Sequence, residues 1–307
     1  MSGTLIVVCG PTASGKTKLA IQLAKHFSAE IISADSRQIY KELKIGSAPP
    51  SEAELKEAKH HFIASRNLDE DYNAGAFEKD VLALLAQLFQ ENKFAILVGG
   101  SGLYIDAVCN GFDKVPSSFP EIRKQLQDLY EAKGIEQLQN KLKELDPVYY
   151  NKIDLSNPQR LMRALEVCMG TGKSYSLLRE GKKNIRDFRI IIIGLELPRD
   201  VLYKRIDARV DEMMKAGLLE EATKLISKKD LNALQTVGYK ELFHFFENKT
   251  SLDEAIDLIK RNSRRYAKRQ LTWFRRDKEI QWFSPDDEKR IIHFIGNENE
   301  VSTRLSP

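Results

Sequence analysis

The segment from Gly10 to Thr17 constrains this chain most, because its glycines, lysine and threonine have the spacing of a phosphate-binding loop. A continuous apolar run, Thr4 to Cys9, precedes the segment, and helical spacing of apolar residues from Lys16 to Phe27 follows it. The order strand, glycine-rich turn and helix predicts a parallel α/β core that binds a diphosphate. The alternative is a glycine turn that binds no ligand.

Each position of this loop has an expected role. The glycines let successive backbone N–H groups turn toward phosphate oxygens. The Lys16 ammonium adds a mobile positive charge, and the Thr17 hydroxyl can ligate Mg²⁺. The helix that begins near Lys16 directs the positive end of its dipole to the same place. The predicted diphosphate or nucleotide site therefore comprises Gly10, Pro11, Thr12, Ala13, Ser14, Gly15, Lys16 and Thr17.

Apolar runs alternate with helical segments along much of the chain. Further strands are expected at Glu30 to Ala34, Phe94 to Val98 and Ile190 to Leu197, whereas His60-His61 is expected to be a junction between a loop and a strand. From Val201 onward the chain is expected to be helical. Strands that alternate with helices predict a parallel sheet with right-handed crossovers.

The stretch from about Phe119 to Gly181 breaks this alternation, because only helical spacing occurs within it. We therefore expect an α/β fold, with a P-loop NTPase-like parallel sheet flanked by helices and a helical insertion domain. Residues 1–118 and 186–307 would form the catalytic core with a basic helical C-terminal part, and residues 119–185 the insertion.

Composition and cysteine usage indicate a water-soluble cytoplasmic protein. The 307 residues are 42% apolar and 30% charged. No apolar run is long enough for a membrane helix, and the N-terminus lacks the charged start of a secretory signal. Three widely spaced cysteines suggest neither a disulfide framework nor a metal site, which favours a reducing compartment. No coiled-coil seam is found, so a monomer is the default expectation.

Positive charge is concentrated near the C-terminus, although the net charge is only +4. Pairs of basic residues recur every four positions, and Asp277 is the only acid among them. This spacing predicts a basic stripe on one helix, which can neutralise RNA phosphates; a solvated helix face is the alternative. The interleaved Tyr266, Trp273 and Phe274 are expected to pack into the core, and stacking on loop bases of the RNA is the alternative. The basic residues are Lys260, Arg261, Arg264, Arg265, Lys268, Arg269, Arg275, Arg276 and Lys278.

Two polar segments follow expected strands. Asp35 comes after the strand that begins at Glu30, and Gly99-Gly100-Ser101-Gly102 follows the strand that begins at Phe94. Ligands in open parallel sheets sit beyond the carboxyl ends of the strands, so Asp35 should lie near the phosphate loop. There it is either a proton acceptor, or an aspartate that caps a helix or hydrogen-bonds to a ligand of a metal ion. Motor ATPases place a metal-binding Asp at the end of such a strand, whereas this chain has glycines there. Glycines allow the close approach of a substrate.

Seven segments in order along the chain together resemble the tRNA dimethylallyltransferase (isopentenyl-tRNA transferase) family. Only the phosphate loop among them is generic, and the combination is specific to the family. One departure is Ser101, where members often carry Thr, but the hydroxyl is kept. The segments are GPTASGKT at 10–17, ADSRQIY at 34–40, VGGSGLY at 98–104, NPQRLMRALEV at 157–167, RIDARV at 205–210, TVGYKE at 236–241 and YAKRQLTWFR at 266–275.

The resemblance implies transfer of the dimethylallyl group from dimethylallyl diphosphate to N6 of adenine 37 in the anticodon stem-loop of tRNA. Diphosphate leaves, Mg²⁺ assists, and no ATP is spent. Asp35 would be the general base, and Ser101 would orient the amine or Asp35. The catalytic residues implied are Lys16, Thr17, Asp35, Ser101 and Arg209, with Arg205 as a further candidate for the diphosphate contact.

The resemblance also implies tRNA contacts, with adenine 37 extruded from its stacked loop into a pocket. Plainer interpretations exist, since the arginines of the insertion could be solvated helix-surface residues and Arg209 could pair with Asp207 or Asp211. The implied contacts are Asp35, Ser36, Arg37, Gln38, Ser101, Arg123, Gln159, Arg160, Leu161, Met162 and Arg163.

Two other functions are compatible with the phosphate loop alone. One is a small-molecule phosphotransferase that uses ATP, and the other is a non-catalytic, nucleotide-gated RNA-binding protein. The basic stripe and the helical insertion favour RNA over a metabolite. Asp35 and the Gly99–Gly102 segment favour chemistry over passive binding.

Overall fold

The computed structural model describes residues 3–113, 115, 119–179, 181 and 184–303, and the chain forms two compact units. The first comprises Met1–Cys109 with Arg186–Pro307, and the second is Asn110–Ile185. The second unit thus begins at residue 110, whereas the sequence pattern placed its start at residue 119.

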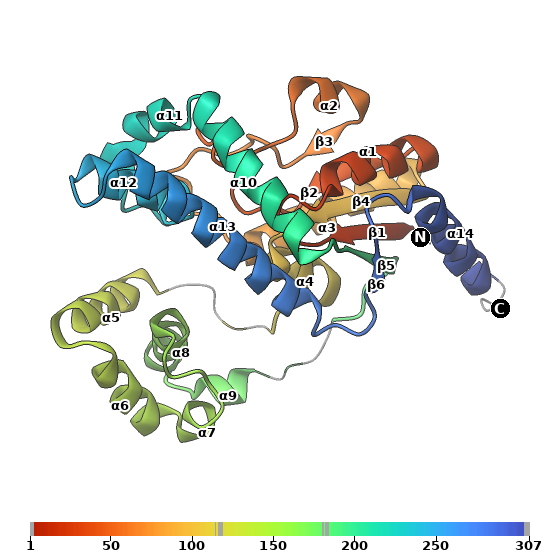
Figure 1. Ribbon diagram of the computed structural model, residues 1–307. Coiled ribbons are helices and arrows are strands. Elements are labelled where there is room, and N and C mark those ends of the chain that lie inside the picture. Colours follow the sequence, from red (N-terminus) through yellow and green to blue (C-terminus); the bar gives the residue numbers. More distant parts are fainter. Residues whose placement is uncertain (1–2, 114, 116–118, 180, 182–183, 304–307) are drawn as a thin grey trace. The chain divides into compact units, whose positions relative to one another are not determined.

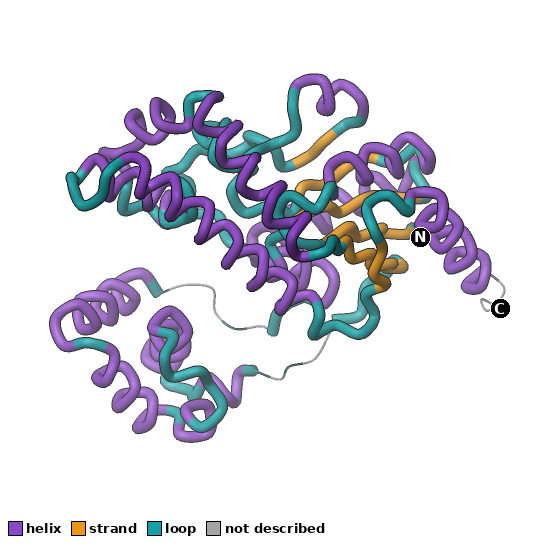
Figure 2. Tube along the Cα trace, viewed as in Figure 1, coloured by secondary structure: helices purple, strands orange, loops and turns teal. Residues whose placement is uncertain are grey.

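A six-stranded parallel sheet in the order β3-β2-β4-β1-β5-β6 is the centre of the first unit (Figures 1 and 2). The predicted α/β fold is confirmed. Every residue of the central strand is buried, which explains its unbroken apolar sequence. The strands are β1 (Thr4–Cys9), β2 (Glu30–Ser33), β3 (His60–His61), β4 (Phe94–Gly99), β5 (Arg189–Leu195) and β6 (Gln281–Phe283).

Two of these strands differ from the sequence prediction. His60-His61 is itself the short strand β3, which pairs with β2, and not a junction. The C-terminal part is not wholly helical, because β6 adds an edge strand beside β5. Strands of two and three residues are too short to show an alternating pattern of apolar and polar residues.

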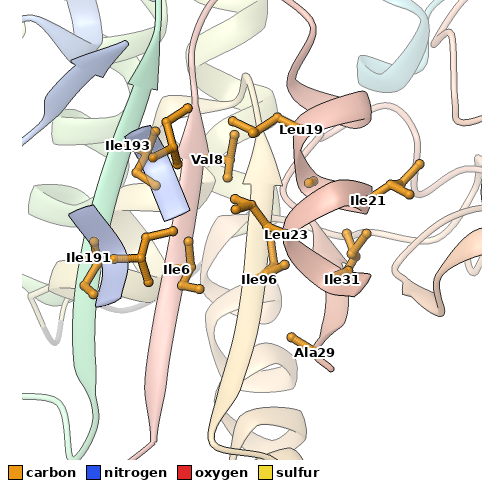
Figure 3. Close-up of a cluster of buried hydrophobic side chains, with 14 of the residues drawn as sticks. Ile6, Val8, Leu19, Ile21, Leu23, Ala29, Ile31, Ile96, Ile191 and Ile193 are labelled. Carbon is orange, nitrogen blue, oxygen red and sulfur yellow. The ribbon is translucent and has the colours of Figure 1, made fainter. Parts of the chain in front are cut away.

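Helices cover the sheet and extend beyond it. Leu19 and Leu23 of α1 pack against Ile6, Val8 and Ile96 of the strands in the buried cluster of Figure 3. None of the described helices combines the length and the apolar character needed to cross a membrane. The helices of the first unit are α1 (Lys16–Phe27), α2 (Glu52–Glu57), α3 (Ala74–Glu91), α4 (Gly102–Asn110, whose last residue belongs to the second unit), α10 (Arg199–Lys215), α11 (Leu218–Leu225), α12 (Tyr239–Phe246), α13 (Leu252–Phe274) and α14 (Glu288–Thr303).

A second buried cluster joins α10, α11, α12 and α13 to the loop after β2. Its largest fully buried member is Tyr239, whose hydroxyl donates to Glu221 Oε1 at 2.6 Å. The Glu221 carboxylate also accepts backbone N–H groups of Lys44, Ile45 and Gly46, each at 2.9 Å. The helices thereby fix the loop that follows Asp35.

The second unit is wholly helical in its described residues, with a core of its own. Leu126, Leu138 and Leu142 pack with Leu161 and Leu165 in that core. Its helices are α5 (Pro120–Lys133), α6 (Ile135–Leu145), α7 (Pro147–Tyr150), α8 (Pro158–Thr171) and α9 (Tyr175–Leu178).

Candidate active site

The phosphate loop lies between the end of β1 and the first turn of α1. Gly10 and Gly15 have φ of 145° and 93°, and Ala13 has φ of 63°, so this turn needs a left-handed backbone at three positions. A Cβ at Gly10 would lie 2.7 Å from the backbone oxygen of Leu195, which excludes a side chain there. The first turn of α1 contains no acidic residue to oppose an anion.

A cavity of about 820 Å³ opens beside this loop in the first unit. Its walls come from segments that are distant in sequence: the loop, the segment from β2 to just after β3, the end of β4, α10, residues 235–244 at the start of α12, and α13. The apolar part of the wall is formed mainly by α10 and α13. The lining residues include Thr12, Lys16, Thr17, Asp35, Ser36, Arg37, Gln38, His60, Gly100, Ile206, Arg209, Val210, Met213, His244, Ile259, Tyr266 and Gln270.

Lys16 and Arg209 bring two positive charges to one end of this cavity. Lys16 Nζ donates to the backbone oxygen of Pro11 at 2.6 Å, and Arg209 donates to Thr12 Oγ1 at 3.3 Å and to the Ala48 oxygen at 3.0 Å. These acceptors are neutral. Among the described residues, no carboxylate lies within ion-pair distance of either cation. The local excess of positive charge suits an anion of high charge, such as a diphosphate.

The pKa values of both cations are lowered in this cavity. Burial, and after it the charge of Arg209, lower the pKa of Lys16 to about 8. Burial likewise lowers the pKa of Arg209. The carboxylate of Asp35 opposes both shifts, which places Asp35 in the same electrostatic environment.

Helix α10 shows why Arg209 is available to the cavity. The two acids proposed as its alternative partners are occupied, because Asp207 pairs with Arg264 and Asp211 pairs with Lys260, both on α13. Arg205 is exposed and does not line the cavity, so the structure gives it no place beside the loop.

Asp35 lies at the carboxyl end of β2, as the sequence analysis predicted. Its Oδ1 accepts the backbone N–H of Arg37 at 2.9 Å and that of Gln38 at 3.4 Å, which orders the turn that follows. Asp35 caps no α-helix, because this segment forms turns only. Since the residue also lines the cavity, one carboxylate can both order the turn and accept a proton.

The hydroxyl of Ser101 contacts Ser36, the residue that follows Asp35. Its Oγ accepts the backbone N–H of Ser36 at 3.0 Å and donates to the Ser36 hydroxyl at 3.2 Å. Ser101 itself is not part of the cavity wall. Its contacts therefore orient the segment next to Asp35.

The basic stripe on α13 is divided. Lys260 and Arg264 face α10 and are paired with its acids, whereas Arg261, Arg265 and Lys268 are exposed. Arg269 is also exposed, and its guanidinium lies 5.8 Å from the centre of the Tyr266 ring.

Of the three interleaved aromatic residues, only Phe274 is fully buried, as expected of all three. Trp273 is half-buried and donates to Asp106 Oδ2 of α4 at 3.1 Å. Tyr266 is 37% exposed and lines the cavity, so the prediction that it packs into the core is wrong.

The remaining predicted tRNA contacts lie in the helical unit. Arg123 donates to Gln159, and Arg123 and Arg163 both pair with the buried carboxylate of Glu166. Gln159 and Arg160 are exposed. The side chains of Leu161 and Met162 are fully buried in the core of this unit, so only their backbone is available for contact.

Comparison with known proteins decides among the candidate families. The IPP transferase family model matches residues 38–277. The chain belongs to this family. The resemblance read from the seven sequence segments is thereby confirmed.

Relatives of this IPP transferase family member match it over nearly the whole chain. A tRNA dimethylallyltransferase of Christiangramia forsetii is 53% identical over 304 residues, which cover 99% of this chain and 100% of the relative. The crystal structure of the full-length tRNA isopentenylpyrophosphate transferase from Bacillus halodurans has a TM-score of 0.74 and 35% identity, with 99% of each chain covered.

A eukaryotic dimethylallyltransferase, whose structures capture it acting on tRNA, matches with a TM-score of 0.73 and 28% identity. The match covers 89% of this chain and 70% of that protein.

Three parts of the site escaped the sequence analysis. Gln270 lines the cavity, although the sequence analysis included it only within the segment 266–275 and gave it no role. Ala48 supplies an acceptor to Arg209 from a loop with no motif. His60 and His244 line the cavity although they lack metal-ligand spacing. Only Gln270 had a signal in the sequence, because it lies within the segment 266–275 that resembles the family.

Proposed function

We propose that this enzyme transfers the dimethylallyl group of dimethylallyl diphosphate to N6 of adenine 37 in tRNA and releases diphosphate. The observation that carries the proposal is the pair of partly buried cations, Lys16 and Arg209, which share a cavity with Asp35. Membership of the IPP transferase family supports the prenyl donor and disfavours an ATP-dependent phosphotransferase.

The diphosphate end accounts for the departure of the leaving group. As the bond between the allylic carbon and the diphosphate oxygen breaks, negative charge grows on the diphosphate. Backbone N–H groups of the loop, Lys16 and Arg209 are positioned to stabilise that charge. The apolar wall of Ile206, Val210 and Met213 suits a five-carbon hydrocarbon group.

Asp35 accounts for the proton. An exocyclic adenine amine is a weak nucleophile, so it gains from losing a proton as its bond to carbon forms. In the proposed step the nitrogen–carbon bond forms, the carbon–oxygen bond breaks and the proton passes to Asp35. Ser101 contributes by holding Ser36, the neighbour of Asp35.

The residues beside the loop fit a Mg²⁺ ion that is bound mostly by substrate. Thr17 lines the cavity with a hydroxyl ligand, while the described residues contain no group of three or more His, Cys, Asp or Glu side chains that could hold a metal. Mg²⁺ commonly binds through one or two protein ligands, water and substrate phosphates. When bound, the ion would neutralise part of the charge on the leaving diphosphate.

For tRNA we propose two contact surfaces, each within one unit. In the first unit, Ser36, Arg37 and Gln38 line the cavity that would receive an extruded adenine, and exposed basic residues of α13 would meet RNA phosphates. In the helical unit, the contacts would come from Arg123 and from the exposed members of segment 159–163. We expect the enzyme to act as a monomer in the cytoplasm.

The proposal is tested by incubating the protein with radiolabelled dimethylallyl diphosphate, Mg²⁺ and unmodified tRNA, with and without ATP. Label should enter the tRNA at a rate that ATP does not raise. Absence of label in the tRNA, together with phosphate transfer from ATP to a small molecule, would overturn the proposal.

A further inference from the structure

One buried amide, that of Gln270 on α13, joins the two loops that meet at the active site. Its Oε1 accepts the backbone N–H of Thr12 in the phosphate loop at 2.9 Å. Its Nε2 donates to the backbone oxygen of Gly100, after β4, at 2.9 Å. The residue is only 6% exposed, so each hydrogen bond forms away from bulk water.

The amide packs directly against the backbone of Gly100. A Cβ at residue 100 would lie 2.2 Å from Gln270 Nε2, so the absence of a side chain at Gly100 admits the amide. The contact requires a donor and an acceptor on one planar group, which a carboxylate or an aliphatic side chain lacks. These two requirements explain a glutamine opposite a glycine at this point.

Neighbouring side chains of α13 hold the same region. Tyr266, one helical turn earlier, lines the same cavity, and Trp273 donates to Asp106 of α4. The helix is therefore held to the Gly100–Ser101 segment by Gln270 and to the helix that follows this segment by Trp273. Through Ser101, that segment holds Ser36 beside Asp35.

We propose that Gln270 is a positioning residue that sets the separation between the bound diphosphate and the amine-accepting side of the cavity. Its bond to Thr12 fixes the loop that would bind the diphosphate of the prenyl donor, and its bond to Gly100 fixes the segment that contains Ser101 and lies next to Asp35. The proposal rests on the proposed transfer reaction. Displacements of about 1 Å at reacting groups reduce rates on the order of 100-fold, so a link between the two loops has kinetic weight.

The test compares Gln270→Met with Trp273→Phe on the same helix. Gln270→Met keeps the length of the side chain but removes both hydrogen bonds, whereas Trp273→Phe removes the hydrogen bond to α4 and leaves both loop contacts in place. We expect kcat for dimethylallyl transfer to fall on the order of 10- to 100-fold in Gln270→Met, with the KM for tRNA unchanged within about twofold. Trp273→Phe should retain kcat within about twofold while lowering the unfolding temperature comparably.

A second variant tests the direction of the effect. Gln270→Glu keeps the acceptor for Thr12 but places a carboxylate beside the diphosphate site, so the KM for dimethylallyl diphosphate should rise more than the KM for tRNA. A kcat of Gln270→Met within twofold of wild type, equal losses of kcat in Gln270→Met and Trp273→Phe, or equal KM changes for both substrates in Gln270→Glu would each overturn the proposal. Wild-type transfer activity in the same assay shows separately whether the proposed function holds.

Discussion

Arginine side chains serve two different purposes in the two units of this molecule. In the cavity of the first unit, Arg209 donates to the neutral oxygens of Thr12 and Ala48. In the helical unit, Arg123 and Arg163 share the buried carboxylate of Glu166. In the first arrangement the positive charge of Arg209 is not neutralised by any carboxylate of the described residues and is available to a ligand. In the second, the charges of Arg123 and Arg163 are partly neutralised by Glu166 and stabilise the packing of the helices.

Asp35→Asn should give the largest loss of transfer rate among the variants of the two units. It leaves Lys16 and Arg209 in place and removes the proposed proton acceptor. The amide oxygen can still accept the N–H groups of Arg37 and Gln38, so the turn should survive. We expect kcat to fall on the order of 10²- to 10⁴-fold with the KM for the donor little changed. Steady-state kinetics measure both values, and retention of the full rate would remove Asp35 from the mechanism.

Arg209→Met removes the positive charge that Arg209 contributes to the cavity. Loss of one cation beside the leaving diphosphate should lower kcat/KM for the donor on the order of 10²- to 10³-fold. Lys18→Gln is the matched control, because Lys18 is exposed on α1 close to the loop, and it should retain kcat/KM within about twofold. Similar losses in the two variants would indicate that total charge matters rather than the position of Arg209.

The lowered pKa of Lys16 predicts a pH dependence of donor capture. Below a pH of about 8 the free enzyme carries a charged Lys16, and above it this charge is progressively lost. Hence kcat/KM for dimethylallyl diphosphate should fall as pH rises through about 8, since this parameter reports groups of the free enzyme. Lys16→Arg should lose this alkaline limb, and a limb that persists in that variant would assign it to another group.

A smaller effect is expected on α13, where paired and exposed basic residues occur on one helix. Replacement of Arg261, Arg265 and Lys268 by glutamine should weaken tRNA binding and reduce its slope against salt by about one per lost phosphate contact. The Lys260→Gln/Arg264→Gln double variant should change the slope less, because these residues are paired with Asp211 and Asp207. A wild-type affinity that is flat between 50 and 200 mM salt would remove this helix from RNA binding.

The smallest effect on chemistry should come from Glu166→Gln, which tests the structural arginines. The charge that pairs with Arg123 and Arg163 is lost, while an oxygen that can accept the N–H of Phe119 is kept. We expect the helical unit to lose about 1–3 kcal/mol of unfolding free energy, measured by denaturant titration. Donor KM should not change; a large rise would mean that this cluster affects the diphosphate site.

The sequence predicted the features of this protein that depend on local pattern. Buried strands and the phosphate loop have periods and spacings that are visible in one chain, so β1, β4 and β5 were located to within two residues. The chain's pattern did not show which charges pair. Arg209 and Arg264 look alike in sequence, and only the packing of α10 against α13 gives Asp207 to Arg264 and leaves Arg209 to the cavity.

Contacts between segments that are distant in sequence could not be predicted either, because they also depend on how the helices pack. The bonds of Gln270 to Thr12 and Gly100 depend on where a helix near the C-terminus meets two loops of the sheet. Leu161 and Met162 belong to a segment matched as a whole, yet helical periodicity buries them and exposes Gln159 and Arg160.

The most direct test of this account is the stoichiometry of a single turnover. Enzyme with labelled dimethylallyl diphosphate should be mixed with an unmodified tRNA transcript and with one that carries guanine at position 37, and the nucleosides and released diphosphate then quantified. The account predicts one N6-(dimethylallyl)adenosine at position 37 for each diphosphate released, and no label in the guanine transcript. Diphosphate release without label in the tRNA, or equal labelling of both transcripts, would contradict it.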